Sequence, residues 1–325
     1  MAWRRVWLTL LARAIGLQAT PDNAEEKLTA LARQHQAIFV LDGLEDLFQE
    51  FSSNHRQQRA LRALLTGCTE WLRSLRGRPL GLVVFVRRDL VLNAIQQNTN
   101  QFFARHQAYE LRWNRTEALR LVAWVCEQAD VLRSSREVAI RNASEDFLIK
   151  LLFDVWGQKL GLPNSREARS EAWFFAALSD FNLQIQARDI VSFLSVAAEY
   201  SAADKNVARW RDRLLIPTAM RQALPECSRD KIADISQENP PVGTLFQDLQ
   251  RLPRDSRKIP FTLETVKVSP SDARLLEANG VLFRDDDQYW IPEIYRHGLG
   301  FGLSGTGRSR MLAIAKSIRG RGGSD

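Results

Sequence analysis

The sequence predicts a mostly α-helical protein that contains a partial parallel α/β core in its first third. Two short apolar runs, residues 37–42 and 80–86, have the length and composition of buried strands, and a helical pattern over residues 56–76 separates them. Two apolar strands joined by a helix are typical of a parallel sheet that is covered on both faces. From about residue 115 to 225 the apolar spacing is helical throughout.

The composition is that of a folded protein with two or three domains. The chain has 325 residues, of which 45% are hydrophobic and 26% charged. Its net charge of +7 is compatible with nucleic acid, nucleotide phosphates or an acidic partner, and an ordinary solvated surface is the favoured explanation. Cys68, Cys126 and Cys227 show no metal-binding spacing, which indicates buried thiols in a reducing compartment. No apolar run of about 18 residues predicts a membrane span, so we expect a cytoplasmic protein without membrane contacts.

Charged residues follow both predicted strands. The first 34 residues read as two helices, and the strand after them ends at Asp42. The second strand ends at Arg87, Arg88 and Asp89. Because ligands of parallel α/β sheets bind at the carboxyl ends of the strands, two charged strand ends in succession predict a binding site.

The C-terminal part predicts a helix followed by a hairpin. Residues 271–278 read as a helix, and two short strands follow, joined by the acidic residues 285–287. This order is typical of a winged helix. A linker or turn is expected at residues 236–241, and the Gly- and Arg-rich tail is predicted to be partly disordered. The expected domains are a partial core (1–114), a helical subdomain (115–235), a winged-helix-like domain (236–303) and a basic tail (304–325).

The acidic end of the first strand carries the chemistry. The carboxylate of Asp42 at the end of a buried strand suits Mg²⁺, which prefers oxygen ligands and retained waters. Glu45, three residues on, is placed to polarise a water that attacks a phosphate. The plainer alternative is a strand end followed by a helix whose first turn favours acids.

Residues 38–46, four apolar residues followed by Asp-Gly-Leu-Glu-Asp, resemble the Walker B motif of STAND ATPases and come closest to its NACHT form. The resemblance implies a P-loop NTPase core that uses ATP and Mg²⁺. It implies Asp42 as the Mg²⁺ ligand and Glu45, with Asp46, as residues that support hydrolysis. It spans roughly residues 1–300, but only the two strand ends are specific.

The resemblance also implies nucleotide-binding residues elsewhere. The next strand of the family ends in a sensor 1 residue near the γ-phosphate, and Arg88 fits this place, with Arg87 as the second candidate. Arg188 resembles a lid arginine of the sensor 2 kind. His297 is the nearest match to the histidine with which the family's winged helix contacts nucleotide. The alternatives are a surface arginine pair, a surface Arg–Asp pair and a packed histidine.

One departure from the family is plain. The sequence contains no Gly-x-x-x-x-Gly-Lys-Ser/Thr loop to hold phosphates. Either the chain is the C-terminal part of a longer protein that supplies this loop upstream, which we favour, or the ATPase is degenerate. ATP hydrolysis is therefore expected only with the loop supplied.

These features favour a nucleotide-dependent signalling switch with protein partners or self-association through the helical subdomain and the winged helix. A DNA-binding transcriptional regulator is the first alternative. Helix 271–278 carries two acids and one arginine, and the hairpin tip is acidic, so nucleic acid is a disfavoured partner, although the basic tail can still bind it nonspecifically. The second alternative is a catalytically dead interaction scaffold, which the missing loop supports.

Overall fold

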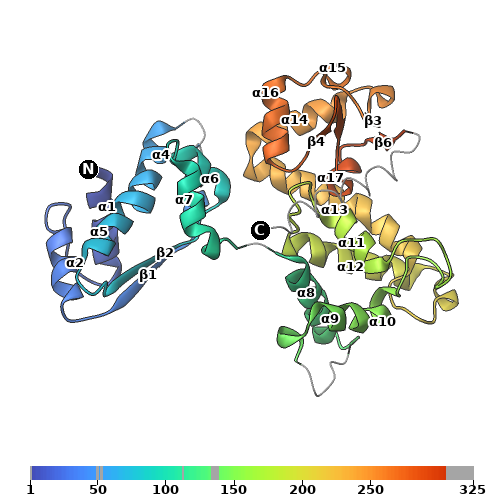
Figure 1. The fold of residues 1–325 in the computed structure, drawn as a ribbon, viewed down its shortest axis with the longest axis horizontal. Coiled ribbons are helices and arrows are strands. Elements are labelled where there is room, and N and C mark those ends of the chain that lie inside the picture. Colours follow the sequence, from blue (N-terminus) through green and yellow to red (C-terminus); the bar gives the residue numbers. More distant parts are fainter. Residues whose placement is uncertain (1, 49–50, 52–53, 112, 133–138, 305–325) are drawn as a thin grey trace. The chain divides into compact units, whose positions relative to one another are not determined.

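The computed structural model describes residues 2–48, 51, 54–111, 113–132 and 139–304, and the chain forms two compact units, residues 1–110 and 111–325. Helices dominate both units, and the strands are short (Figure 1). This confirms the expectation of a mostly α-helical protein with a small parallel sheet. Of the described helices, none is long and apolar enough to cross a bilayer. The predicted basic tail lies outside the described residues, apart from its first residue.

The first unit alternates helices with two strands. Its elements are α1 (Ala2–Ala14), α2 (Ala24–Ala32), β1 (Ala37–Leu41), α3 (Leu44–Leu47), α4 (His55–Arg62), the π-helical turn η1 (Ala63–Cys68), α5 (Thr69–Ser74), β2 (Leu80–Val84), α6 (Arg88–Ala94), α7 (Thr99–His106) and the 3₁₀ turn η2 (Gln107–Tyr109). The side chain of Asn54 caps α4 by accepting hydrogen bonds from the backbone N–H groups of Arg56 and Gln57. From there α4, η1 and α5 form one continuous helical rod.

Strands β1 and β2 pair in parallel, as the sequence predicts. Their register runs from Ala37 opposite Leu80 to Leu41 opposite Val84, so both strands end at the same level. The backbone N–H of Phe85 extends the ladder by donating to the carbonyl of Leu41 at 2.8 Å. The rod α4–η1–α5 forms the crossover that a parallel pair requires.

The two faces of this sheet differ, which corrects the prediction of a sheet covered on both sides. Phe39 and Leu80 point into the core that the helices cover. Ile38 and Val40 point to the opposite face, where no described residue of this unit buries them. Figure 1 shows the helices of this unit on one side of β1 and β2. The described sheet therefore has one covered face and one bare apolar face.

The second unit is helical for most of its length. Its elements are α8 (Arg115–Gln128), η3 (Ile140–Asn142), α9 (Glu145–Leu151), α10 (Phe153–Trp156), α11 (Ser170–Leu178), α12 (Ala187–Ala203), η4 (Val207–Arg209), α13 (Pro217–Glu238), α14 (Pro240–Arg251), η5 (Arg254–Ser256), β3 (Lys258–Ile259), α15 (Leu263–Val266), α16 (Pro270–Ala278), β4 (Phe283–Asp285), β5 (Gln288–Trp290), α17 (Glu293–Arg296) and β6 (Gly302–Leu303).

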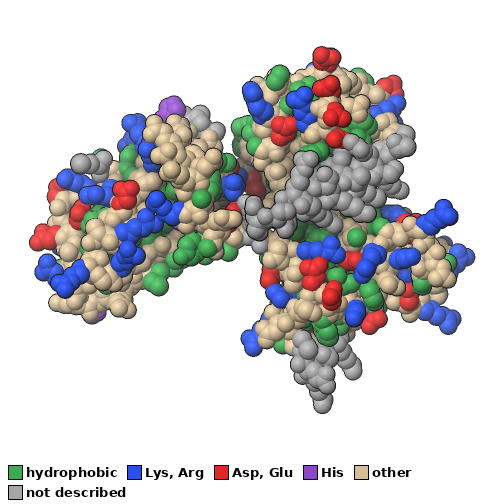
Figure 2. Space-filling view, in the orientation of Figure 1, with side chains coloured by type: hydrophobic (Ala, Val, Ile, Leu, Met, Phe, Trp, Pro, Cys, Tyr) green, Lys and Arg blue, Asp and Glu red, His purple; other side chains and the backbone are tan. Residues whose placement is uncertain are grey.

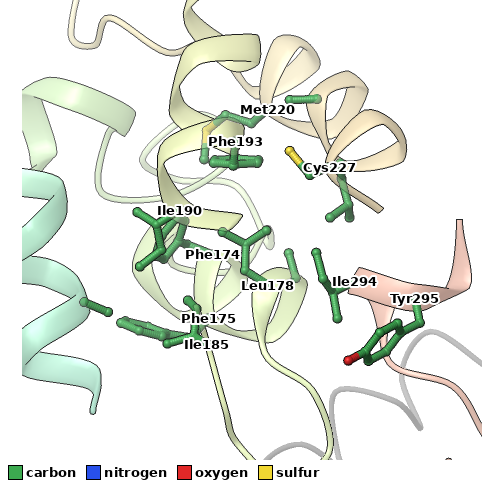
Figure 3. Close-up of a cluster of buried hydrophobic side chains, with 14 of the residues drawn as sticks. Phe174, Phe175, Leu178, Ile185, Ile190, Phe193, Met220, Cys227, Ile294 and Tyr295 are labelled. Carbon is green, nitrogen blue, oxygen red and sulfur yellow. The ribbon is translucent and has the colours of Figure 1, made fainter. Parts of the chain in front are cut away.

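One continuous hydrophobic core holds this unit together. It extends from Ala118 of α8 to Phe301. Figure 3 shows a part of it, in which Phe174 of α11, Phe193 of α12 and Ile294 of α17 lie among other buried side chains. The elements of the expected helical subdomain and those of the expected winged helix therefore share a single core.

Two local predictions in this unit need correction. Residues 236–241, expected as a linker or turn, form a turn that is much shorter than expected: α13 runs to Glu238, and α14 begins at Pro240 after Asn239 alone. The two prolines, read as loop residues, occupy the first turn of α14, where a missing N–H costs nothing. The helical pattern expected throughout residues 115–225 is interrupted after Trp156, where Gly157 adopts a positive φ of 73°.

The turn after α16 is tied to the loop after α11. The N–H of Phe181 donates to the carbonyl of Gly280 at 3.1 Å, and the rings of Phe181 and Phe283 lie 5.5 Å apart. Gly280 has a φ of +69°, and a Cβ at this position would lie 2.6 Å from Cγ of Asp180. Burial raises the pKa of Asp180 to about 7, although a hydrogen bond from the N–H of Gln184 opposes the shift. Glycine is therefore required here both by its φ and by the close approach.

Gly280→Ala should destabilise the second unit by about 1–3 kcal/mol, because it adds both left-handed strain and a clash with Asp180. Gly77→Ala is the matched control: its φ is +76°, but its Cβ would meet no atom within 4 Å. The control should cost about 1 kcal/mol from strain alone. Thermal unfolding of both variants measures the difference, and equal shifts would contradict the close contact.

Candidate functional site

The charged residues after β1 and β2 gather at the carboxyl end of the sheet in the first unit. Asp42 follows β1 directly and is exposed. Its Oδ1 accepts a hydrogen bond from the N–H of Gly43 at 2.9 Å. Gly43 has a φ of +71°, a conformation that glycine adopts without strain, and it turns the chain into α3. The carboxylate of Asp42 thus stands at the strand end with Oδ2 free of any hydrogen bond from a described residue.

Glu45 and Asp46 lie in the first turn of α3, and both are exposed. Neither carboxylate pairs with a Lys or Arg among the residues that the structure describes, and the same holds for Asp42. These three acids, which have no Lys or Arg partner among the described residues, concentrate negative charge within five positions. The helix dipole also favours acids in the first turn of a helix. An ordinary helix start therefore explains the position of Glu45 and Asp46 equally well.

Arg87 directly precedes α6, and its side chain is held by a neighbouring residue. Its Nε and Nη2 donate to the two carboxylate oxygens of Asp89 at 3.1 and 3.0 Å. This fork-to-carboxylate geometry fixes the guanidinium plane. The arginine lies at the same sheet edge as Asp42, because Leu41 and Val84 are register partners.

Arg88 is held by residues further along the chain. Its Nη1 donates to Oε1 of Glu110 at 2.8 Å, and its guanidinium lies over the ring of Phe103, 4.3 Å from the centroid. Its side chain is still 53% exposed. Arg87 and Arg88 therefore both follow the carboxyl end of β2, and each has a carboxylate partner within the first unit.

The acids of this edge fit a Mg²⁺ ion only as part of a larger site. No three His, Cys, Asp or Glu side chains converge on one point anywhere in the described part of the chain. Mg²⁺ usually takes one or two carboxylates together with waters and substrate phosphates, a role that Asp42 with its free Oδ2 suits. The remaining ligands would have to come from the nucleotide and from a phosphate-holding loop.

Arg188, the lid candidate, lies in the second unit at the start of α12. Its Nη1 is 2.6 Å from Oδ2 of Asp234, and its Nη2 is 3.3 Å from Oε1 of Glu238. The hydrogen bond to Asp234 raises the pKa of Arg188 further above its ordinary value. The arginine is 59% exposed and bridges α12 to α13. Arg188 therefore forms a surface ion pair, as the alternative interpretation expects. Its partners are Asp234 and Glu238, and not the neighbouring Asp189.

His297 follows α17 in the same unit. Its Nε2 lies 3.2 Å from Oε2 of Glu293 and 2.8 Å from Nη2 of Arg296. Burial alone would raise the pKa of Glu293, but hydrogen bonds from His297 and Arg296 leave it below the ordinary value. The imidazole therefore belongs to a local three-residue cluster.

Sequence reasoning missed two features of the first unit. Glu110 and Phe103, which hold Arg88, lie 22 and 15 residues from it, and no spacing rule links them to a strand end. The bare face of the sheet was missed because the residues that point to either face of the strands are all apolar or glycine, so no alternation marks the exposed side. The Arg87–Asp89 pair could have been predicted from the sequence, because the two residues are only two positions apart.

A scan against protein-family models gave no match, and neither did searches of the curated proteins and the solved structures. The resemblance to STAND ATPases consequently rests on residues 38–46, Arg87 and Arg88 alone. Any function assigned to them is a proposal.

A buried ion pair and an exposed one lie close together at α12, and comparing them tests whether Arg188 has a structural role. Nζ of Lys231 lies 2.8 Å from Oδ2 of Asp189, and both side chains are 5% exposed. Lys231→Met should cost about 3–5 kcal/mol, because it leaves the Asp189 carboxylate buried without a partner. Arg188→Met should cost less than about 1 kcal/mol, because its pair is exposed. Chemical denaturation measures both, and a large loss from Arg188→Met would make that arginine structural.

Proposed function

We propose that this chain carries the metal and sensor side of an ATP site in a STAND-type nucleotide switch. Asp42 is the Mg²⁺ ligand, Glu45 with Asp46 supports hydrolysis, and Arg88, with Arg87 second, senses the γ-phosphate. The phosphate-holding loop comes from a segment outside the described residues. The second unit, with a helical lid and a winged helix, responds to the bound nucleotide.

One observation carries this proposal. The acid-ending strand and the arginine-ending strand are neighbours in a parallel sheet and end at the same level. An Asp and two Arg that are separated by more than 40 positions in the sequence thereby meet one edge of one sheet. Ligands of parallel α/β sheets bind at this edge. A metal-bound phosphate placed there would find a carboxylate for its metal and guanidinium groups for its oxygens.

The C-terminal elements support the winged-helix part of the proposal. Helix α14, strand β3, helices α15 and α16, and the hairpin β4–β5 follow one another in this order, and Phe261 forms an antiparallel bridge with Tyr289 of the hairpin. The turn after α16 contacts Phe181 and Asn182 of the helical part. Because the turn after α16 already contacts the helical part, this module is better suited to packing within the protein than to inserting into DNA.

DNA binding by this module stays the weaker alternative. The hairpin tip carries Asp285, Asp286 and Asp287, and the only base next to them, Arg284, lies 3.4 Å from Oδ1 of Asp287. An acidic tip repels the phosphate backbone that supplies most nonspecific affinity for DNA.

In a protein that contains the phosphate-holding loop, Asp42→Ala should reduce Mg²⁺-dependent ATP hydrolysis by about 100-fold or more, because the metal loses the carboxylate that is proposed as its ligand. Glu26→Ala, an exposed acid on α2, is the control and should retain full activity. Phosphate release measures both. Hydrolysis that survives Asp42→Ala would refute the Walker B assignment.

Calorimetry with Mg-ATP separates the switch from a dead scaffold. The 325-residue chain alone should bind ATP weakly or not at all, because acids and two paired arginines do not replace a phosphate-holding loop. Binding should return when the in-frame upstream sequence is added. Absence of binding in both proteins would favour the scaffold, and tight binding by the chain alone would show that its phosphate site lies elsewhere.

A further inference from the structure

The helical rod α4–η1–α5 and the turn after it carry a concentration of exposed arginines. Residues 55–78 contain six arginines, one acid, Glu70, and no lysine. All six are exposed, and together they are called the arginine face: Arg56, Arg59, Arg62, Arg73, Arg76 and Arg78. Leu61 and Leu72, on the other side of the rod, fill the core of the first unit. Figure 2 shows Lys and Arg side chains spread over this unit, with few Asp and Glu between them.

No carboxylate of the described residues neutralises the arginine face. None of its six guanidinium groups forms an ion pair with an Asp or Glu that the structure describes. Arg59 donates only to the backbone carbonyl of His55, at 3.3 Å, and the guanidinium of Arg56 lies 5.5 Å from the ring centroid of Trp3. Solvated surfaces ordinarily intersperse charges of both signs. Six cations beside one acid therefore indicate a surface suited to a polyanion.

We propose that the arginine face binds the phosphate backbone of a duplex nucleic acid, independently of base sequence. From Arg56 to Arg73 the rod spans roughly 25 Å, because a helix rises about 1.5 Å per residue. Over this length each strand of a duplex presents about seven phosphates, since they follow one another at about 3.4 Å along the axis. A guanidinium group binds two phosphate oxygens side by side, a geometry that lysine cannot form. An all-arginine surface therefore suits a backbone of phosphates.

The composition of the rod favours a duplex over other acidic partners. Protein interfaces have apolar, often aromatic centres, whereas the exposed positions of the rod hold Arg, His, Glu and Ser alone. Proteins that bind single strands add exposed aromatic side chains on which bases stack. Trp71, the only Phe, Tyr or Trp of the rod, is buried. A duplex needs neither feature, because its phosphates lie on the outside and its bases are already stacked.

The arginine face uses none of the residues that the proposed function assigns. It lies on the crossover between the two strands, whereas Arg87 and Arg88 follow the carboxyl end of β2. The acidic hairpin tip that disfavours DNA binding belongs to the second unit. Duplex binding by the rod is therefore independent of the ATP site, and it assigns no nucleic-acid contact to the winged-helix-like module.

Fluorescence anisotropy with a short DNA duplex tests this proposal over a series of salt concentrations. The variant Arg59→Gln/Arg62→Gln/Arg73→Gln removes three charges of the arginine face. At low salt its affinity should fall by about 10-fold or more, and the slope of log K against log salt should become shallower by about 2–3, because fewer counterions are released. An RNA duplex of the same length, tested in competition, shows which duplex is preferred. Binding of either one through these arginines upholds the proposal.

A matched control removes the same charge from the second unit. Arg229, Arg251 and Arg284 are exposed, and each pairs with an acid three positions away. Replacing all three by glutamine should leave the affinity within about 2-fold, because these arginines are already neutralised by their acids. Circular dichroism checks that both triple variants are folded.

Removing the acid of the rod gives a test in the opposite direction. Glu70→Gln deletes the one carboxylate that lies between the arginines of α4 and those that follow it. It should tighten duplex binding by about 2–3-fold at low salt, because a negative charge no longer faces the phosphates. An unchanged or weaker affinity would contradict a duplex lying along this part of the rod.

Other ligands and other sites give distinct results. Absence of duplex binding at low salt overturns the proposal, and so do equal losses from the rod variant and the second-unit control. A loss caused only by replacing the tail arginines Arg308, Arg310 and Arg319 would assign the binding to the tail. Tighter binding of polyglutamate, of phosphatidylserine vesicles or of single-stranded DNA than of either duplex would assign the face to another partner. Each of these results overturns the proposal.

Discussion

The parallel pairing of β1 with β2 is the constraint on which the first unit depends. Because Leu41 lies opposite Val84, both strands end together, and the acids after one meet the arginines after the other. The same register decides which side chains enter the core, since a shift by one residue would exchange Phe39 for Val40. The pairing also forces a long crossover, and the rod α4–η1–α5 meets this need while covering the inner face.

In the second unit, the helical part and the C-terminal part share one hydrophobic core, which opposes movement of one part relative to the other. Helix α13 packs against α12, α14 and α17, so it belongs to both the expected lid and the expected winged helix. Its close approaches include Gly298, where a Cβ would lie 2.5 Å from the carbonyl of Ser228. Separating the two parts would expose a continuous apolar core. If the protein changes conformation as the proposed function requires, the second unit is expected to move as a whole.

The sequence predicted what local patterns determine. The strands at 37–41 and 80–84, their parallel pairing and most helices follow from apolar period and length. The sequence could not distinguish the inner face from the outer face, because Ile38 and Val40 are as apolar as Phe39. It also misread Pro240, since proline marks a loop and a helical first turn alike. The partner of Arg88, Glu110, comes from tertiary folding and leaves no local signal.

The pairing of the two arginines bears on whether this edge can sense an anion. The Arg88–Glu110 pair is exposed at the arginine, and such pairs contribute about 0.2–1 kcal/mol. A phosphate oxygen can form a charge-assisted hydrogen bond that is stronger than this net contribution. Arg88 can therefore exchange Glu110 for a phosphate at small cost. Arg87, whose fork is bound at both nitrogens by Asp89, would lose two hydrogen bonds in the same exchange. Under the proposed function, this geometry ranks Arg88 above Arg87 as the candidate sensor of the γ-phosphate.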